Sequence, residues 1–291
     1  MELISNYMRD DTYRHMLNKL TQKTFGFDFE SWVTQGYFEG DYIPYSFMDE
    51  GRIISNVSAN RMKFMQNGAM KYYIQIGTVM TDENYRKQGL AAKLMKHVIE
   101  TYEQECDGIY LFGDLSALDF YQKMNFKVAN QYRYYVTDNV CNCEKTGERF
   151  KPIRYLGDEI KKSYLDMVRN SVHHSSFEQI NKYGLQMFYT AGLDDVFYAE
   201  DIECFIVLEQ EECAVLKSVL CNRKVALVDI LQRIDIEGQK CRLGFIPHEE
   251  DRNICIFEEY DGGEDYRLFY RGKELESIEQ DKLYFPDLSH A

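Results

Sequence analysis

The 291-residue sequence has few prolines and no long apolar run. Only four prolines occur and no segment is of low complexity, which excludes an intrinsically disordered chain. There is no signal peptide and no run of about 18 apolar residues, so we expect a cytoplasmic protein without a membrane partner. The eight cysteines include no C-x-x-C pair. Cys141 and Cys143 form a lone C-x-C, for which we expect reduced thiols in preference to zinc, and no metal site.

Positive charge is also scarce. The 34 lysines and arginines face 48 acidic residues, which gives a formal net charge of −14. Such a chain is a poor general ligand of nucleic acid, and its acidic field favours cationic small molecules or peptides. The hydrophobic content of 45% supports a sizeable core, and the length suits two ordinary domains.

Two common phosphate-binding motifs are missing. The chain has neither G-x-x-x-x-G-K-[ST] nor G-x-G-x-x-G, which excludes a P-loop and a dinucleotide fingerprint. Residues 72–95 instead predict a strand from Tyr72 to Met80, a basic turn ending at Gly89, and an amphipathic helix from Leu90. A helix N-terminus after a glycine turn points backbone N–H groups at an anion. The expected ligand is a phosphate or pyrophosphate.

The elements around this turn form an ordered series. Upstream, the periodicity predicts two helices and then a meander of strands, joined by the turns Asp49-Glu50-Gly51 and Gln66-Asn67-Gly68. Downstream we expect a buried strand, a short helix and a longer strand. The expected ranges are helices at 10–24 and 28–38, strands at 42–48 and 52–64, a strand at 108–113, a helix at 117–124 and a strand at 126–136.

Two motifs resemble the GNAT N-acetyltransferase superfamily. Arg86-x-x-Gly89-x-Ala91 after a strand resembles its acetyl-CoA signature, and ALDFYQKMNF, about 30 residues further on, resembles its second motif. The stretches FGFDFESW, GYFEGDYIPYS and QIGTVMTDENYR are similar to a bacterial two-part group related to the enhanced-intracellular-survival acetyltransferases. The resemblance implies an α+β GNAT fold over residues 1–140, with a mixed, mostly antiparallel sheet flanked by helices.

The remainder predicts a second unit. Residues 141–150 are polar and read as a linker, and residues 151–291 repeat the order of the first half. We expect helices at 158–169, 176–189 and 225–234, and strands at 196–198, 204–208, 214–220, 241–246, 253–258 and 266–270. The stretch Cys221 to Lys224, where a second phosphate turn would lie, has no glycine. A degenerate GNAT-like domain is therefore expected, and a plain α+β partner domain is the alternative.

The resemblance implies a set of cofactor contacts. Backbone groups of one strand would pair with the pantetheine arm, the basic turn would hold the pyrophosphate, and a serine would bond the pantetheine. These residues are, in that order, Val79, Met80 and Thr81; Arg86, Lys87, Gln88, Gly89, Leu90, Ala91 and Ala92; and Ser116. Asp114 stands where many family members have asparagine, which puts one cofactor contact in doubt, because a carboxylate cannot donate a hydrogen bond.

Catalytic roles follow from the same resemblance. Tyr121 stands at the position of the general acid that protonates the departing thiolate, and the alternative is a packed aromatic residue. Gln75 stands where some relatives have a glutamate that acts as the general base, and an amide cannot take this role. The base would then be a water chain, another acidic residue or the carboxylate of the terminal Ala291. The end LYFPDLSHA is apolar enough to dock, although a frayed tail is the alternative.

The substrate is expected between the first helices and the first long strand. Aromatic residues lie there among acids, which suits a cationic amine, although core aromatics under an acidic face would give the same pattern. The expected contacts are Trp32, Tyr37, Phe38, Tyr42 and Tyr45. We thus expect an acetyl-CoA-dependent N-acetyltransferase acting on a primary amine of a small cationic or peptide substrate. The alternative is a non-catalytic acyl-CoA-binding or scaffold protein; a homo-oligomer is possible in either case.

Overall fold

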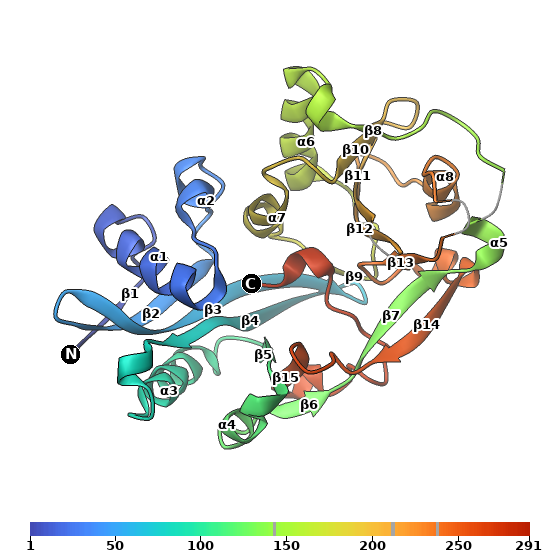
Figure 1. The fold of residues 1–291 in the computed structure, drawn as a ribbon. Helices are drawn as coiled ribbons and strands as arrows, with labels where there is room; N and C mark the ends of the chain where they lie inside the picture. The colour runs from blue at the N-terminus through green and yellow to red at the C-terminus, as the bar shows by residue number, and fades with distance from the viewer. Residues whose placement is uncertain (142–143, 211–212, 237–238) are drawn as a thin grey trace.

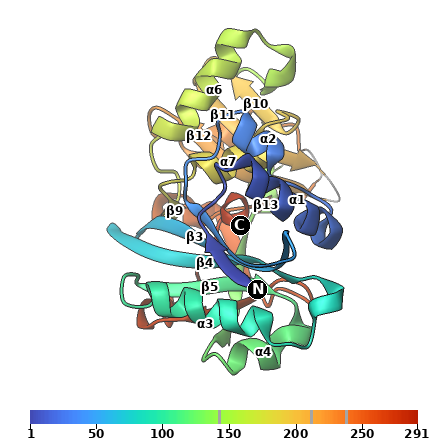
Figure 2. The same cartoon turned by 90° about the vertical axis from the view of Figure 1, so that its left-hand side faces the viewer.

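The structure is a computed structural model, which describes residues 1–141, 144–210, 213–236 and 239–291. Two mixed β-sheets, each flanked by helices, lie side by side (Figure 1). The end of the chain reaches the space between the two sheets, as both views show (Figures 1 and 2).

The first sheet has the order β1-β2-β3-β4-β5-β15-β6, with β9 added to the end of β3. Its pairs are antiparallel except β4 with β5, which run parallel. The strands are β1 (Glu2–Ser5), β2 (Tyr42–Asp49), β3 (Arg52–Gln66), β4 (Ala69–Thr81), β5 (Gly108–Gly113), β6 (Lys127–Ala129), β9 (Phe177–Gln179) and β15 (Arg267–Arg271).

The second sheet repeats this plan. In the order β8-β10-β11-β12-β13-β7-β14, only the pair β12 with β13 is parallel. Its strands are β7 (Gln131–Val136), β8 (Lys151–Pro152), β10 (Val196–Ala199), β11 (Cys204–Gln210), β12 (Ala214–Cys221), β13 (Cys241–Leu243) and β14 (Cys255–Tyr260). Along these two orders, each sheet has three antiparallel pairs, one parallel pair and two further antiparallel pairs, and β9 adds one antiparallel pair to the first sheet.

The two halves of the chain exchange one strand each. β15, from the last 30 residues, lies between β5 and β6 in the first sheet, and β7, from the first half, lies between β13 and β14 in the second. One buried hydrophobic core accordingly contains residues of both halves, among them Phe64, Tyr110 and Leu216. Neither half completes its sheet alone. The domain boundary expected near residues 141–150 stays a prediction, because each sheet contains strands from both sides of this boundary.

Helices cover both faces of the first sheet. α1 and α2 lie on one face and α3 and α4 on the other (Figure 1). The bounds are α1 (Asp11–Phe25), α2 (Glu30–Thr34), α3 (Leu90–Tyr102), α4 (Leu118–Gln122), α5 (Asp138–Cys141), α6 (Asp158–Asn170), α7 (Tyr183–Thr190) and α8 (Leu227–Leu231). The predicted apolar face of α3 is confirmed: Leu94 and Val98 are fully buried.

Local sequence signals explain the first boundaries. The Asp10 side chain accepts the backbone N–H groups of Thr12 and Tyr13 and so caps α1, and Gly26 ends it at φ 81°. The turn between β3 and β4 has positive φ at both central residues, Asn67 and Gly68, which is the geometry of a tight hairpin.

Two expected elements are wrong in detail. The strand expected over 126–136 is broken at Asn130 into β6 and β7, which belong to different sheets. The helix expected over 176–189 is strand β9 followed by the shorter α7, because residues 177–179 pair with the end of β3. Tertiary pairing overrides the local pattern in both cases. The second cysteine of the C-x-C, Cys143, lies outside the described residues.

Candidate functional site

A cleft of about 830 Å³ opens where β4 and β5 separate. It runs from the start of α3, past β4 and α4, to the α1–α2 segment, α7 and the end of the chain. Its lining residues are Phe25, Phe27, Phe29, Trp32, Tyr42, Gln75, Ile76, Gly77, Thr78, Val79, Ala91, Leu111, Phe112, Gly113, Asp114, Ala117, Phe120, Tyr121, Leu185, Phe188, Tyr189, Asp265, Tyr266, His290 and Ala291. This volume is large enough for a small-molecule ligand or part of a cofactor.

The cleft exists because the parallel ladder between β4 and β5 is short. The last register pair joins Gln75 to Tyr110, although β4 continues to Thr81. Thr78 has φ 42°, and the pairing of β4 with β3 shifts register at this point. The Asn56 amide donates to the Thr78 carbonyl at 3.0 Å and holds the bulge. Beyond Gln75, the backbone edge of β4, with Val79, therefore faces the cleft.

The basic turn has the geometry of an anion site. Gly89 caps α3 at φ 73°, and a Cβ built there would meet no atom within 4 Å. Lys87 also has positive φ, at 62°, and Arg86 Nε donates to the Thr81 carbonyl at 3.2 Å. The first N–H groups of a helix have no partner within it, so α3 presents donors and its positive dipole end to this space. Ala91, in the first turn, lines the cleft.

Tyr121 lies on α4, in the cleft wall. Its side chain is buried, with 7% exposure, and its ring would lie 3.0 Å from a Cβ at Gly113. Burial raises the pKa of Tyr121 to about 12, with a smaller contribution from Asp114. The phenol therefore keeps its proton at neutral pH and can act as a donor.

Asp114 is used by its own turn. Its carboxylate accepts the Ser116 N–H at 2.6 Å and so caps the next turn of helix. Hydrogen bonds from the Ser116 hydroxyl and N–H lower the pKa of Asp114. Asp114 lines the cleft, whereas Ser116 is exposed outside it.

The end of the chain docks inside the cleft. A Cβ at Gly77 would lie only 2.5 Å from a carboxyl oxygen of Ala291, so the two residues are in direct contact. The His290 ring stacks on Phe112 with centroids 4.0 Å apart, and the Tyr189 hydroxyl donates to the His290 carbonyl at 2.6 Å. Burial lowers the pKa of His290 to about 4, so its ring is neutral at pH 7.

A network from the second half holds this tail. Arg242 donates to both carboxylate oxygens of Asp287, at 2.8 and 3.2 Å, and the Tyr284 hydroxyl donates to the same carboxylate at 2.6 Å. Burial would raise the pKa of Asp287, but Arg242 outweighs it and holds that pKa below its usual range. Phe285 stacks on Tyr110 at 4.1 Å, inside the shared core. The tail is thus an ordered part of the fold.

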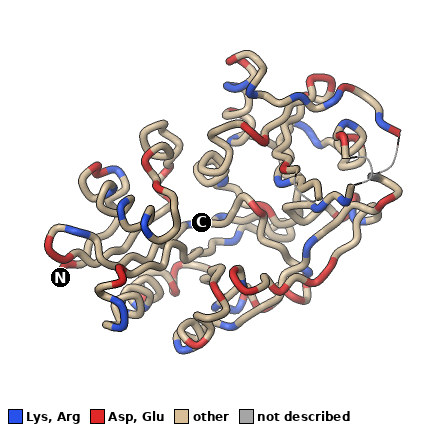
Figure 3. Tube along the Cα trace, viewed as in Figure 1, with Lys and Arg blue, Asp and Glu red and all other residues tan. Residues whose placement is uncertain are grey.

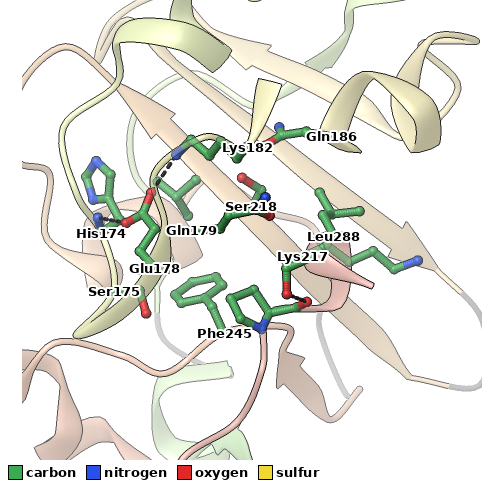
Figure 4. A pocket seen from close by; sticks show the side chains of 13 residues that line it. His174, Ser175, Glu178, Gln179, Lys182, Gln186, Lys217, Ser218, Phe245 and Leu288 are labelled. Atoms are coloured by element: carbon green, nitrogen blue, oxygen red, sulfur yellow. Dashed lines mark hydrogen bonds and ion pairs between the residues drawn. The ribbon is translucent and has the colours of Figure 1, made fainter. Parts of the chain in front are cut away.

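A smaller cavity lies behind the tail (Figure 4). Phe245, Leu288 and the Glu178–Lys182 ion pair line it, and the Glu178 carboxylate also accepts the His174 N–H at 3.0 Å. Its volume of about 40 Å³ has room for a few water molecules only. The large cleft is therefore the candidate site.

The expected substrate residues divide into two groups. Trp32 and Tyr42 line the cleft. Phe38 packs behind Trp32 at 5.1 Å, and Tyr37 packs against the second half of the chain. Tyr45 lies in the core beneath α3, where its hydroxyl pairs with that of Tyr102 at 2.9 Å. These three do not line the cleft.

Among the expected cofactor and catalytic residues, the structure brings Val79, Ala91, Tyr121 and Ala291 to one cleft. Met80 is buried in the core beneath α1 and α2, and its carbonyl accepts the Ser55 hydroxyl. The structure also adds lining residues that the sequence did not indicate. They include Phe25, Phe27 and Phe29, then Leu185, Phe188 and Tyr189 of α7, and Asp265, Tyr266 and His290.

The alternation of phenylalanines at 25, 27 and 29 was the one local signal that could have found the first three. The α7 residues have no such local signal in the sequence, because only the packing of the two halves brings them to the cleft.

Within residues 1–141, 144–210, 213–236 and 239–291, no three potential ligands gather for a metal ion. No helix in these ranges combines the length and the apolar character needed to cross a bilayer. Charges of both signs are scattered along the described chain (Figure 3).

Part of the sequence and most of the fold are similar to those of known proteins. Residues 8–126 match the acetyltransferase (GNAT) family model. Among solved structures, a probable N-acyltransferase from Enterococcus faecalis shares 14% identity at a TM-score of 0.58, with 94% of this chain and 73% of that one covered. A GCN5-related N-acetyltransferase from Kribbella flavida shares 13% at 0.57, covering 93% and 72%. Eis1 from Mycobacterium abscessus shares 10% at 0.55, covering 92% and 73%. No curated protein matches the sequence significantly.

These matches confirm the expected family and fold class. The first part of the chain is a GNAT domain, and the fold of nearly the whole chain, including the second sheet, is shared with the three structures. At such low identity they show the fold alone.

Proposed function

Because residues 8–126 are a GNAT acetyltransferase domain, we propose that the chain transfers the acetyl group of acetyl-CoA to a primary amine of a small cationic or peptide substrate. One observation carries the proposal. A single cleft joins the start of α3, the open edge of β4, Tyr121 and the carboxyl group of Ala291. Anion binding, carbonyl polarisation, proton donation and proton acceptance would then take place along one path.

The cofactor end of the cleft is formed by α3 and β4. The N–H groups after Gly89, with Arg86 and Lys87 in the preceding turn, suit a pyrophosphate, and the open space at Gly89 leaves room for it. The edge of β4 at Val79 can pair with the amides of the pantetheine arm as an added strand would. An N–H of this edge could also polarise the thioester carbonyl.

The proton transfers are assigned to Tyr121 and Ala291. The attacking amine must lose a proton, and the carboxylate of a chain that ends at Ala291 accepts it beside β4. Gln75 lines the cleft but cannot serve as this base. The Tyr121 hydroxyl, held protonated by burial, donates to the sulfur that leaves as the C–S bond breaks.

The test is a calorimetric titration of acetyl-CoA and CoA into the wild type, Gly89→Asp and Gly89→Asn. Both variants place a similar side chain at φ 73°, but only aspartate adds a negative charge. Repulsion of about 1–3 kcal/mol would weaken binding roughly 10- to 100-fold in Gly89→Asp relative to Gly89→Asn.

Equal affinities of the two variants would exclude phosphate binding at this turn. Absence of binding to the wild type would reject the acetyltransferase. Binding without turnover of any amine would favour the non-catalytic acyl-CoA-binding protein. Two features support this alternative: the Asp114 carboxylate is used to cap its own turn, and β4 has no carboxylate at Gln75.

A further inference from the structure

The acceptor end of the cleft is bounded by interlocking aromatic rings. We call these rings the aromatic wall; they are Phe27, Phe29, Trp32, Tyr42 and Phe188. Phe29 lies 4.8 Å from Tyr42, and Phe188 lies 5.6 Å from Trp32 and 5.7 Å from Phe27, between ring centroids. Phe188 comes from α7, in the second half of the chain. The second half therefore helps to form the acceptor end.

Further aromatic side chains stand exposed at this cleft. Phe25, Tyr189 and Tyr266 line it and are 47%, 48% and 57% exposed. Leaving large apolar rings in water costs free energy, and a group of them at the mouth of a cleft is typical of a ligand-binding surface. About half of the surface of each residue is thus available to a ligand, and the Tyr189 hydroxyl also holds His290.

The acidic residues of the α1–α2 region are occupied elsewhere. Glu30 pairs with Arg14 at 3.0 Å, Glu39 pairs with Arg169, and Asp41 accepts the Asn181 amide at 2.9 Å. Asp28, the remaining acid of residues 28–41, accepts the Glu30 N–H at 2.9 Å, and none of the four lines the cleft. The acidic acceptor site expected from their positions in the sequence is therefore not formed.

The charges that remain in the cleft are few and negative. Besides the carboxyl group of Ala291, the charged lining groups are Asp114 and Asp265, and no lysine or arginine lines the part that the structure describes. The cleft thus suits a ligand with one positive charge near Ala291. An ammonium group is also attracted to aromatic ring faces.

We propose that the acceptor is an arylalkylamine, a primary amine joined by a short aliphatic chain to an aromatic ring. The aromatic wall would hold the ring, and the amine would lie near the Ala291 carboxylate. Polyamines and aminoglycosides carry several charges and hydroxyl groups that need polar partners, which aromatic rings cannot supply. This assignment rests on the proposed transferase function and narrows its substrate to one class.

The fluorescence of Trp32 reports directly on binding at the aromatic wall, because Trp32 is the one tryptophan of the sequence and lies in that wall. Its fluorescence is followed while 2-phenylethylamine, spermidine and kanamycin are titrated separately into the protein with saturating CoA. Release of CoA from acetyl-CoA is assayed with the same amines. The variants are Phe188→Ala, Phe188→Leu and, as a control, Tyr155→Ala, an aromatic residue 79% exposed outside the cleft.

We expect 2-phenylethylamine to bind at least about 10-fold more tightly than the other amines and to be the best acceptor. Loss of one ring from the wall should weaken its binding about 10-fold in Phe188→Ala and less in Phe188→Leu, with no change in Tyr155→Ala. Tighter binding of spermidine or kanamycin would overturn the proposal, as would a saturating 2-phenylethylamine concentration that changes neither fluorescence nor CoA release. Failure of the transferase itself would instead show as loss of acetyl-CoA binding without any amine.

Discussion

Replacing Gly77 by alanine would place a methyl group against the end of the chain. The new Cβ would lie 2.5 Å from a carboxyl oxygen of Ala291 and 2.9 Å from its carboxyl carbon. Gly77 has an ordinary backbone conformation, so alanine adds no backbone strain. Non-bonded carbon and oxygen atoms need roughly 3.3 Å, so Ala291 must move by most of an ångström or leave the cleft.

The expected effect is on catalysis first. A displacement of about 1 Å of a catalytic group can cost about 100-fold in rate, and loss of a general base costs roughly 100- to 10,000-fold. We therefore expect kcat to fall about 100-fold or more. Overpacking at this buried position should cost about 1–3 kcal/mol of folding stability. Because the methyl group meets Ala291 and not the turn at Gly89, acetyl-CoA affinity should stay within about threefold of the wild type.

The assay is steady-state kinetics in a double-mutant cycle with a chain that lacks Ala291. If Gly77→Ala acts only by displacing Ala291, its effect on kcat should vanish in the shortened chain. The matched control is Gly157→Ala, which would meet no atom within 4 Å and should leave the rate unchanged. An equal loss of kcat in the full-length and shortened chains would refute the reasoning, as would full activity of Gly77→Ala.

Three further predictions concern the acid, the tail anchor and pH. Tyr121→Phe should lower kcat about 100-fold at unchanged acetyl-CoA affinity, and because burial raises the pKa of Tyr121 to about 12, its ionisation should cause no alkaline loss of rate below about pH 10. Arg242→Met should cost about 3–5 kcal/mol in urea unfolding by leaving the buried Asp287 carboxylate without its cationic partner, and adding Asp287→Leu should restore most of it. The pKa of His290 is near 4 in the folded protein and near 6.5 in the unfolded chain, so the unfolded chain binds the proton more tightly. The contribution of the neutral ring to the free energy of unfolding, at most about 3 kcal/mol, is therefore complete above pH 6.5 and is lost as the pH falls through 4. His290→Phe should flatten the pH dependence of unfolding in that range. An unchanged kcat in Tyr121→Phe would contradict the first prediction. A double variant as unstable as Arg242→Met would contradict the second, and an unchanged pH dependence in His290→Phe would contradict the third.

The local chemistry of the first half could be predicted from the sequence. Gly89 must take the left-handed conformation before α3, and the apolar residues of this helix repeat every three to four positions, so turn and helix are encoded within about 20 residues. The hairpin at Asn67 and Gly68 is local in the same way. These signals, with the motif around Tyr121, are sufficient to indicate the family, the fold and one end of the cleft.

Tertiary structure decided the rest, because it depends on contacts between residues far apart in the chain. The exchange of β7 and β15 follows from pairing across more than 100 residues, which no local periodicity encodes. Phe188 reaches the cleft only because α7 packs against the α1–α2 segment. Glu30 and Glu39 lie outside the cleft, where they pair with Arg14 and Arg169.

The end of the chain shows the same division. An apolar, aromatic C-terminal stretch is visible in the sequence, and it could equally dock or fray. Arg242 and Tyr110, distant in sequence, fix Asp287 and Phe285 and so direct Ala291 to Gly77. The sequence by itself determined the fold family and the left-handed glycine turn before α3, because both depend on neighbouring residues. Only the packing of the two halves decided which groups line the cleft.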